Sequence, residues 1–207
     1  MELPERGQSW AELSKGMEDA GKHDVAWRDG KAAVYVFNAG EEVSRVQREA
    51  YALYQAENGL GPAAFPSLKK MEVDVVQMAL RLLSAPESAG GAMTSGGTDS
   101  ITMAVKAARD AARANGRQEP FNLVLPYSAH LAFDKAAALM DIEIRRVPCK
   151  DYVADVDAMQ RAMDDHTLML VGSAPSFPFG LIDPISDLSR IAEESNVWLH
   201  VDACVGG

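Results

Sequence analysis

Three short runs of the sequence carry the side chains best suited to chemistry, and each lies beside a segment of predicted regular structure. The first is the glycine-rich run at residues 94–100, Thr-Ser-Gly-Gly-Thr-Asp-Ser. The second, residues 127–130, ends in a histidine, and the third, residues 200–203, reads His-Val-Asp-Ala. In α/β sheets, ligands bind in the loops beyond the carboxyl ends of the parallel strands. We therefore expect the three runs to meet at that edge.

The glycine-rich run is suited to a phosphate group. Gly96 and Gly97 allow the backbone to approach a ligand closely. The helix predicted from Thr98 presents unpaired N–H groups and a partial positive charge at its start. The run is neither a dinucleotide-binding fingerprint nor a P-loop. The alternative interpretation is a tight turn that Thr98 caps, since glycine-rich helix starts are common.

The other two runs offer an imidazole and a carboxylate. His130 could stack on a planar ring or take part in proton transfer, although a lone histidine is more often structural. Asp202 ends an apolar strand, where its charge needs a partner. A protonated pyridinium nitrogen is one such partner, and capping a helix or organising a loop is the alternative role. His200 looks less suitable because it lies inside the strand.

Spacing excludes two other kinds of site. No arrangement of His, Cys and Asp in the sequence matches a metal site. The G-x-S-x-G elbow of many Ser-His-Asp hydrolases does not occur.

The pattern of apolar residues predicts an α/β fold. The first 60 or so residues are polar and helix-prone, with Ser9 and Glu12 spaced as a capping box. Helices are predicted at residues 41–58 and 67–84. From residue 90 onward, strands at 122–126, 143–147, 168–173 and 197–202 alternate with helices at 98–115, 129–140, 156–164 and 185–195. Such alternation is typical of a mainly parallel sheet with flanking helices.

The composition favours a soluble, cytoplasmic protein that acts on a small molecule. A formal net charge of −10 disfavours nucleic acid, because the phosphates would be repelled. The two cysteines form no disulfide framework and fit a reducing compartment. The start of the chain lacks the apolar stretch of a signal peptide. No run approaches the ~20 apolar residues that are needed to cross a membrane.

Four motifs follow one another in order. They are the glycine-rich run, then His130 and the Ala-Phe-Asp-Lys-Ala of residues 132–136, then Gly-Ser-Ala-Pro-Ser-Phe-Pro-Phe-Gly at 172–180, then His-Val-Asp-Ala-Cys at 200–204. This series closely resembles the group II decarboxylase family of enzymes that depend on pyridoxal 5′-phosphate (PLP), and within it the sphingosine-1-phosphate lyases. The resemblance also covers residues 25–31 and 58–72, so it spans nearly the whole chain.

The resemblance implies a fold and a cofactor site. The fold is the aminotransferase-like large domain of fold type I, present here in truncated form at residues 61–207 after an N-terminal helical segment at residues 1–60. The cofactor is PLP, with its phosphate bound by Gly97 and Thr98 while Gly96 supplies the turn.

The remaining roles concern the PLP ring. By the resemblance, His130 would stack on one face of the ring and Asp202 would pair with its nitrogen. Ser173 and Ser176 would reach the phenolic side of the ring. Cys204 would lie behind the ring, at a position where amino-acid decarboxylases usually carry alanine.

The sequence departs from the family pattern in two places. The family's Schiff-base lysine lies a few dozen residues beyond the Val-Asp-Ala motif, and the chain ends first; Lys135 matches a non-catalytic position and is no substitute. We therefore expect this chain alone to bind PLP weakly and to be inactive. The lyases also carry a histidine in an Asn-Pro-Leu-His-Pro-Asp run where this sequence has Gly61.

The implied activity is that of a carbon–carbon lyase. Such an enzyme cleaves a phosphorylated long-chain amino alcohol by retro-aldol chemistry and releases an aldehyde and phosphoethanolamine. Gly61 keeps open an amino-acid decarboxylase of the glutamate or aromatic type. A non-catalytic binding or assembly partner is the third alternative. Enzymes of this fold build their sites at a dimer interface, so a homodimer is expected of the intact protein.

Overall fold

The strands and most helices of this protein lie in the second of two units. The computed structural model describes residues 5–32, 36–61 and 63–206, so Pro62 of the 58–72 run and the terminal Gly207 lie outside it. The units are Met1–Phe65 and Pro66–Gly207. We describe each by itself.

The first unit consists of short helices. They are α1 (Trp10–Ala20), η1 (Gly21–His23), η2 (Trp27–Asp29) and α2 (Glu41–Tyr54). The predicted capping box is confirmed at the start of α1, where the Glu12 N–H donates to Ser9 Oγ and the Ser9 N–H donates to Glu12 Oε2. None of the residues of α1 or α2 is buried.

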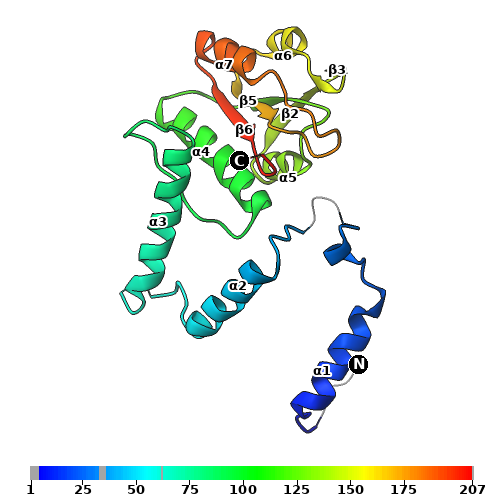
Figure 1. Ribbon diagram of the computed structural model, residues 1–207. Coiled ribbons are helices and arrows are strands. Elements are labelled where there is room, and N and C mark those ends of the chain that lie inside the picture. The colour runs from blue at the N-terminus through cyan, green and yellow to red at the C-terminus, as the bar shows by residue number, and fades with distance from the viewer. Residues whose placement is uncertain (1–4, 33–35, 62, 207) are drawn as a thin grey trace. The chain divides into compact units, whose positions relative to one another are not determined.

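The second unit alternates helices with strands (Figure 1). The order is α3 (Pro66–Leu82), α4 (Gly97–Ala114), β1 (Phe121–Pro126), α5 (Ala132–Leu139), β2 (Ile142–Val147), β3 (Cys149–Lys150), β4 (Val153–Ala154), α6 (Val156–Ala162), β5 (Thr167–Ser173), α7 (Ile185–Glu194) and β6 (Trp198–Asp202). The predicted elements are present, and the short antiparallel pair β3–β4 is an addition to them.

The four long strands form one parallel sheet in the order β2-β1-β5-β6. Every residue of β1 and of β5 is buried, as expected for central strands of a parallel sheet with helices on both faces. The prediction of a mainly parallel α/β sheet is therefore confirmed.

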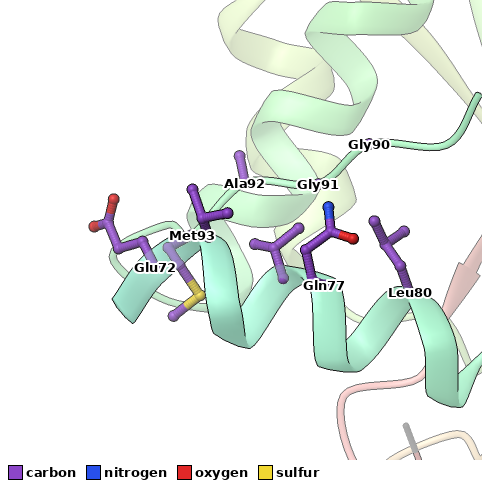
Figure 2. Close-up of a pocket in the computed structure, with 9 residues that line it drawn as sticks. Glu72, Gln77, Leu80, Gly90, Gly91, Ala92 and Met93 are labelled. Atoms are coloured by element: carbon purple, nitrogen blue, oxygen red, sulfur yellow. The ribbon is translucent and has the colours of Figure 1, made fainter. Parts of the chain in front are cut away.

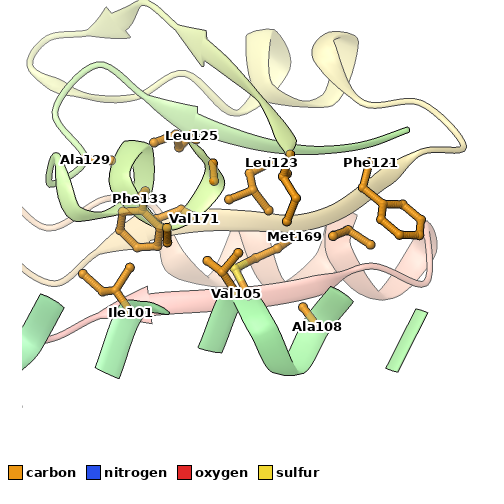
Figure 3. Packing of buried hydrophobic residues seen from close by; sticks show 14 of the residues in the cluster. Ile101, Val105, Ala108, Phe121, Leu123, Leu125, Ala129, Phe133, Met169 and Val171 are labelled. Atoms are coloured by element: carbon orange, nitrogen blue, oxygen red, sulfur yellow. The ribbon is translucent and has the colours of Figure 1, made fainter. Parts of the chain in front are cut away.

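Two apolar clusters cover the two faces of the sheet. On one face, Leu123 and Val171 pack with Val105 of α4 and Phe133 of α5 (Figure 3). On the other face, Val124 and Leu170 pack against α6 and α7. Alternate residues of a strand point to opposite faces. Even-numbered residues of β6 therefore face α4 and α5, whereas Val197 and Leu199 face α6 and α7.

One helix begins later than predicted. The pattern predicted a helix from Ala129 to Met140, but α5 begins at Ala132. Residues 127–131 form a turn instead, in which the Ala129 N–H donates to the carbonyl of Pro126. This turn carries His130, so the difference bears on the candidate site.

In the part of the chain that the structure describes, no helix is both long enough and apolar enough to cross a membrane.

A polar network closes the amino edge of the sheet. Asp164, just before β5, accepts hydrogen bonds from Asn122 Nδ2 at 2.8 Å and from the His166 N–H at 2.9 Å, and it forms an ion pair with Arg145 at 2.7 Å. Burial raises the pKa of Asp164, but these hydrogen bonds and the positive charge outweigh it and lower the pKa to about 2.

Replacing Asp164 by asparagine should therefore destabilise the protein in a pH-dependent way. Its pKa is lower in the folded than in the unfolded state, so the stabilisation is complete above about pH 4 and is lost as the pH falls toward about 2. Because the side chain is 38% exposed, solvent screening limits the loss at neutral pH to about 1 kcal/mol of unfolding free energy.

Urea unfolding at neutral pH and at successively lower pH values measures this effect. Asp165→Asn, one residue along on an exposed position, is the matched control and should change stability little. A difference between wild type and Asp164→Asn that stays constant down to about pH 2 would contradict the assignment.

Candidate functional site

The carboxyl ends of three neighbouring strands form the edge at which the predicted site residues lie. In the β5–β6 ladder, Ser173 is the partner of Asp202, so both strands end level with each other. The Ala174 N–H then donates to the carbonyl of Asp202 at 2.9 Å. The strand β1, which ends at Pro126, pairs with the other side of β5. We call this edge, with residues 126–131, 173–176 and 202–206, the carboxyl rim.

The start of α4 has no side-chain cap. Its N-cap is Gly96, with φ of +153°, a backbone conformation that favours glycine. The nearby polar side chains bond among themselves: Asp99 accepts from the N–H and the hydroxyl of Ser95, both at 3.1 Å, and the hydroxyls of Thr94 and Ser100 lie 2.6 Å apart. The alternative interpretation, a turn capped by Thr98, is therefore wrong.

The same helix start lies against the segment that follows β6. A Cβ placed on Gly97 would lie 3.8 Å from Cys204 Sγ. Farther along, a Cβ on Gly206 would lie 2.3 Å from the carbonyl oxygen of Ala174, so only glycine fits where the loop after β6 crosses the loop after β5. The structure thus brings Gly97, Cys204 and the loop after Ser173 together.

Asp202 organises the loop that follows it. Its Oδ1 accepts the backbone N–H of Cys204 at 3.2 Å, and the residue is partly buried. This contact fits the loop-organising alternative, and it is compatible with a second role because a carboxylate has several acceptor sites. Asp202 and His200 point to the same face of the sheet as α4 and α5.

His130 is exposed at the rim, and its ring is held from one side. Its Nδ1 accepts the backbone N–H of Ala132, the first residue of α5, at 3.1 Å. A neutral imidazole that accepts at Nδ1 carries its proton on Nε2. The ring therefore offers an N–H donor away from the helix.

His200 is closer to the site than its position inside a strand suggested. Its ring meets Phe133 edge to face, with the centroids 5.4 Å apart. Burial lowers the pKa of His200, and the negative charge of Asp202 opposes this shift. His200 thus places a second imidazole two residues before Asp202 on the same face of the sheet. The alternation of side chains along a strand was the signal that could have found it.

Ser173 and Ser176 are both buried at the rim. Ser173 ends β5. Ser176 lies in the loop that follows, and its Oγ has no hydrogen-bond partner within the described residues. A buried hydroxyl without a partner is unfavourable in an isolated protein. It is the kind of group that a bound polar ligand satisfies.

Asp183 is a structural residue of the rim that sequence reasoning missed. Its carboxylate is buried and accepts the N–H of Ser173 and the N–H of Ala154, each at 2.7 Å. The Asp183 N–H also donates to the Ser173 carbonyl at 2.9 Å. The signal was a single aspartate set between Ile182 and Pro184 in an apolar stretch, where a charge needs partners.

Two clefts in the second unit lie away from these residues. One, of about 410 Å³, is lined by α3 and residues 90–93 (Figure 2). The other, of about 480 Å³, lies at the amino edge of the sheet, beside Arg117, Asp164 and Asn196. Neither is lined by Thr98, His130 or Asp202.

Comparison with known proteins identifies the family. The family model of the pyridoxal-dependent decarboxylase conserved domain matches residues 1–207. The chain is 42% identical over 206 residues to sphingosine-1-phosphate lyase 1 of Rattus norvegicus, covering 99% of this chain and 36% of that protein. It is 40% identical over 159 residues to a probable L-tyrosine/L-aspartate decarboxylase of Methanothrix thermoacetophila, covering 76% of this chain and 40% of that protein. The chain therefore belongs to the pyridoxal-dependent decarboxylase family.

A solved structure agrees with this assignment. The sphingosine-1-phosphate lyase of Burkholderia pseudomallei superposes with a TM-score of 0.92 at 37% identity, covering all of this chain and 49% of that one. The fold is thus that of the fold type I PLP-dependent enzymes. The chain spans well under half the length of the curated relatives that it matches.

The cofactor that this family membership implies is PLP, and the residues of the rim fit it. The phosphate needs an anion site, and the start of α4 offers backbone N–H groups without a side-chain cap. A protonated ring nitrogen needs a negatively charged hydrogen-bond acceptor, and Asp202 supplies a carboxylate at the strand end. The buried hydroxyl of Ser176 has an unmet hydrogen bond within the described chain.

Replacing Asp183 by alanine should destabilise the protein strongly. The substitution leaves two buried N–H groups without an acceptor, at a cost of roughly 2–4 kcal/mol of unfolding free energy. Urea or thermal unfolding measures the loss. Asp187→Ala, at an exposed position in the first turn of α7, is the control and should cost under about 1 kcal/mol. Equal losses in the two variants would show that Asp183 does not hold the rim.

Proposed function

We propose that this chain forms part of a PLP-dependent carbon–carbon lyase. Its substrate would be a phosphorylated long-chain amino alcohol, cleaved to an aldehyde and phosphoethanolamine. The observation that supports this best is the 42% identity to a sphingosine-1-phosphate lyase over nearly the whole of this chain. The chemistry of the carboxyl rim is consistent with it.

In this proposal, the start of α4 holds the cofactor phosphate. Gly96 makes the turn that exposes the helix start, and the absence of a Cβ at Gly97 keeps the backbone accessible. The N–H groups of Gly97 and Thr98, together with the partial positive charge of the helix, favour a dianion there. The hydroxyl of Thr98 adds a donor.

The remaining rim residues bind the ring. The Asp202 carboxylate would stabilise a protonated ring nitrogen, and the imidazole of His130 would stack on a ring face. When it is bound, PLP supplies the electron sink for bond cleavage at the substrate's α-carbon. Ser173 and Ser176 contribute polar contacts on the phenolic side, supported by the unmet hydrogen bond of Ser176 Oγ in the described chain. Cys204, which lies next to Gly97, would be behind the ring.

An amino-acid decarboxylase is the second candidate function. The 40% identity to a probable L-tyrosine/L-aspartate decarboxylase favours it, as does Gly61 in place of the histidine expected in lyases. Both reactions use the same cofactor, so the roles assigned to the rim residues are the same in either case.

We also propose that the intact protein is a homodimer. The amphipathic helices α2 and α3 bury none of their residues, and apolar side chains such as Val46 and Met78 are exposed. The cleft along α3 in Figure 2 is bounded by apolar side chains, among them Leu80 and Met93. Surfaces of this kind are typical of protein–protein contacts.

Two further proposals concern the cell and the domains. The free thiols of Cys149 and Cys204 favour a reducing compartment, so we propose that the protein acts in the cytoplasm. We also propose that residues 1–60 form an N-terminal segment and that the PLP-binding domain begins at residue 61.

The proposed function is tested by identifying the products. The full-length product of the gene, loaded with PLP, is incubated with sphingosine 1-phosphate and, separately, with L-glutamate, L-aspartate, L-tyrosine and L-tryptophan. We expect release of a long-chain aldehyde and phosphoethanolamine from the first and no carbon dioxide from the others. Carbon dioxide release without any aldehyde would establish the decarboxylase instead. Without either product, the protein would not be an enzyme of these classes.

Asp202→Asn tests the role of the carboxylate at the ring nitrogen. An asparagine oxygen can still accept the Cys204 N–H, so the loop should persist. Loss of the negative charge should lower kcat on the order of 100-fold, as for other groups that stabilise developing charge. Kinetics of the PLP-loaded full-length protein measure this, and Asp187→Asn is the control. A kcat within a few-fold of wild type would remove Asp202 from the proposed machinery.

A further inference from the structure

The turn that carries His130 has backbone carbonyls that accept hydrogen bonds from a side chain of the neighbouring strand. The turn leaves β1 after Pro126, and its residues Ser128 and Ala129 are buried. Backbone carbonyls in such a turn need donors from elsewhere in the protein. His130 stands at the exposed end of this turn, so its position depends on what supplies those donors.

One guanidinium contacts three of these carbonyls, and that of Pro126 also accepts the Ala129 N–H from within the turn. Arg146 on β2 is paired in register with Leu125, and it therefore points to the face of the sheet that α4 and α5 cover. Its side chain is only 16% exposed. Its Nη1 lies 3.1 Å from the carbonyl oxygen of Pro126, 3.4 Å from that of Tyr127 and 3.3 Å from that of Ala129.

The same guanidinium also holds the helix on the far side of His130. Its Nη2 and Nε donate to the two carboxylate oxygens of Asp134, at 2.5 and 3.3 Å, in a bidentate pair. Asp134 lies in the first turn of α5, two residues after Ala132. The Ala132 N–H donates to Nδ1 of the His130 imidazole. Arg146 thus ties the backbone before His130 to the helix after it.

We propose that Arg146 is a positioning residue that fixes the imidazole of His130 at the carboxyl rim. The inference rests on the proposed role of His130 at the cofactor ring. The guanidinium contacts the carbonyls through Nη1, whose two N–H groups are shared among them, and the carboxylate through Nη2 and Nε; the single ammonium of lysine cannot reach both sets at once. Arg146 touches no reacting group itself. It acts through the turn.

The neighbouring Arg145 provides a matched control. It lies on the same strand, but its register partner is Val124, so it points to the opposite face of the sheet. It also combines ion pairs, to Glu143 and Asp164, with a hydrogen bond to the backbone carbonyl of Ala162. Replacing either arginine by lysine removes a comparable network, but only Arg146 is connected to His130.

The test compares Arg146→Lys with Arg145→Lys in the full-length product of the gene. In the cofactor-free protein, hydrogen exchange of residues 127–133, followed by mass spectrometry, reports the order of the turn. We expect exchange there to be about tenfold faster in Arg146→Lys and unchanged in Arg145→Lys. The Kd for PLP should rise about tenfold in Arg146→Lys, and the visible circular dichroism of the bound cofactor should change. Both quantities should stay within twofold of wild type in Arg145→Lys.

Two further variants separate the positioning role from general stability. Asp134→Asn keeps the carbonyl contacts and breaks the ion pair at a position that is 43% exposed, so it should fold and raise the Kd about threefold. It replaces Arg146→Lys in the comparison if that variant does not fold. In the His130→Gln background, Arg146→Lys should raise the Kd by less than it does in wild type, because the ring that it positions is gone.

The outcomes distinguish this inference from the proposed function. Equal rises in Kd for Arg146→Lys and Arg145→Lys, or unchanged exchange at residues 127–133, would overturn the positioning role. If His130→Gln leaves the Kd unchanged, the proposed role of His130 at the ring is wrong. Faster exchange in Arg146→Lys would then still establish that Arg146 orders the turn, but the link to the cofactor would be overturned.

Discussion

The carboxyl rim depends on how its backbone groups find hydrogen-bond partners once the strands end. A chain that leaves a parallel sheet loses its ladder partners while it is still partly buried. Here three charged side chains provide the hydrogen bonds that the strand ladder no longer provides. Arg146 donates hydrogen bonds to carbonyls at the end of β1 and in the turn that follows. Asp183 accepts the N–H groups at the ends of β4 and β5, and Asp202 accepts an N–H after β6. Hydrogen bonds to charged groups are roughly twice as strong as neutral ones, so the three loops are held firmly.

The start of α4 contrasts with this rim. The polar side chains around it, Thr94, Ser95, Asp99 and Ser100, bond to one another or to the loop before the helix, and none caps the N-cap position. Gly96 makes the turn without a side chain. The net charge of the protein is −10, but the start of a helix carries a partial positive charge from its own backbone. An anion bound there would accept hydrogen bonds from backbone N–H groups that no side chain caps.

Much of the fold could be predicted from the sequence because the long elements have strong apolar periods. The parallel sheet followed from short buried strands between amphipathic helices, and the start of α1 followed from the local spacing of Ser9 and Glu12. The β3–β4 pair was missed because strands of two residues show no period. The predicted start of α5 was wrong because a turn precedes it, and that turn contacts Arg146, which is 17 residues from Ala129 along the chain.

Some site residues could be found from the sequence, and others could not, because their partners lie far away along the chain. Thr98, His130 and Asp202 stand at element boundaries, where residue type and position carry a signal. Asp183 and Arg146 act on partners 10 to 29 residues away, and nothing in their immediate neighbours reveals that distance. Arg145 and Arg146 are adjacent in the sequence. In the structure they point to opposite faces of the sheet and serve opposite edges, which only the register of β2 decides.

The residues proposed to bind the cofactor and the residue where the sequence departs from the lyase pattern lie in different parts of the chain. This separation bears on how a lyase and a decarboxylase could share one fold. Binding a phosphate, stacking on a ring and stabilising a ring nitrogen are demands that both reactions make of the protein. What separates the reactions is which bond at the substrate's α-carbon breaks, and this depends on the groups that hold the substrate. Gly61, where the sequence departs from the lyase pattern, belongs to the first unit, whereas Thr98, His130 and Asp202 belong to the second. A change of substrate in the first unit would leave the charged side chains that hold the rim in place, so one set of rim residues could serve either reaction.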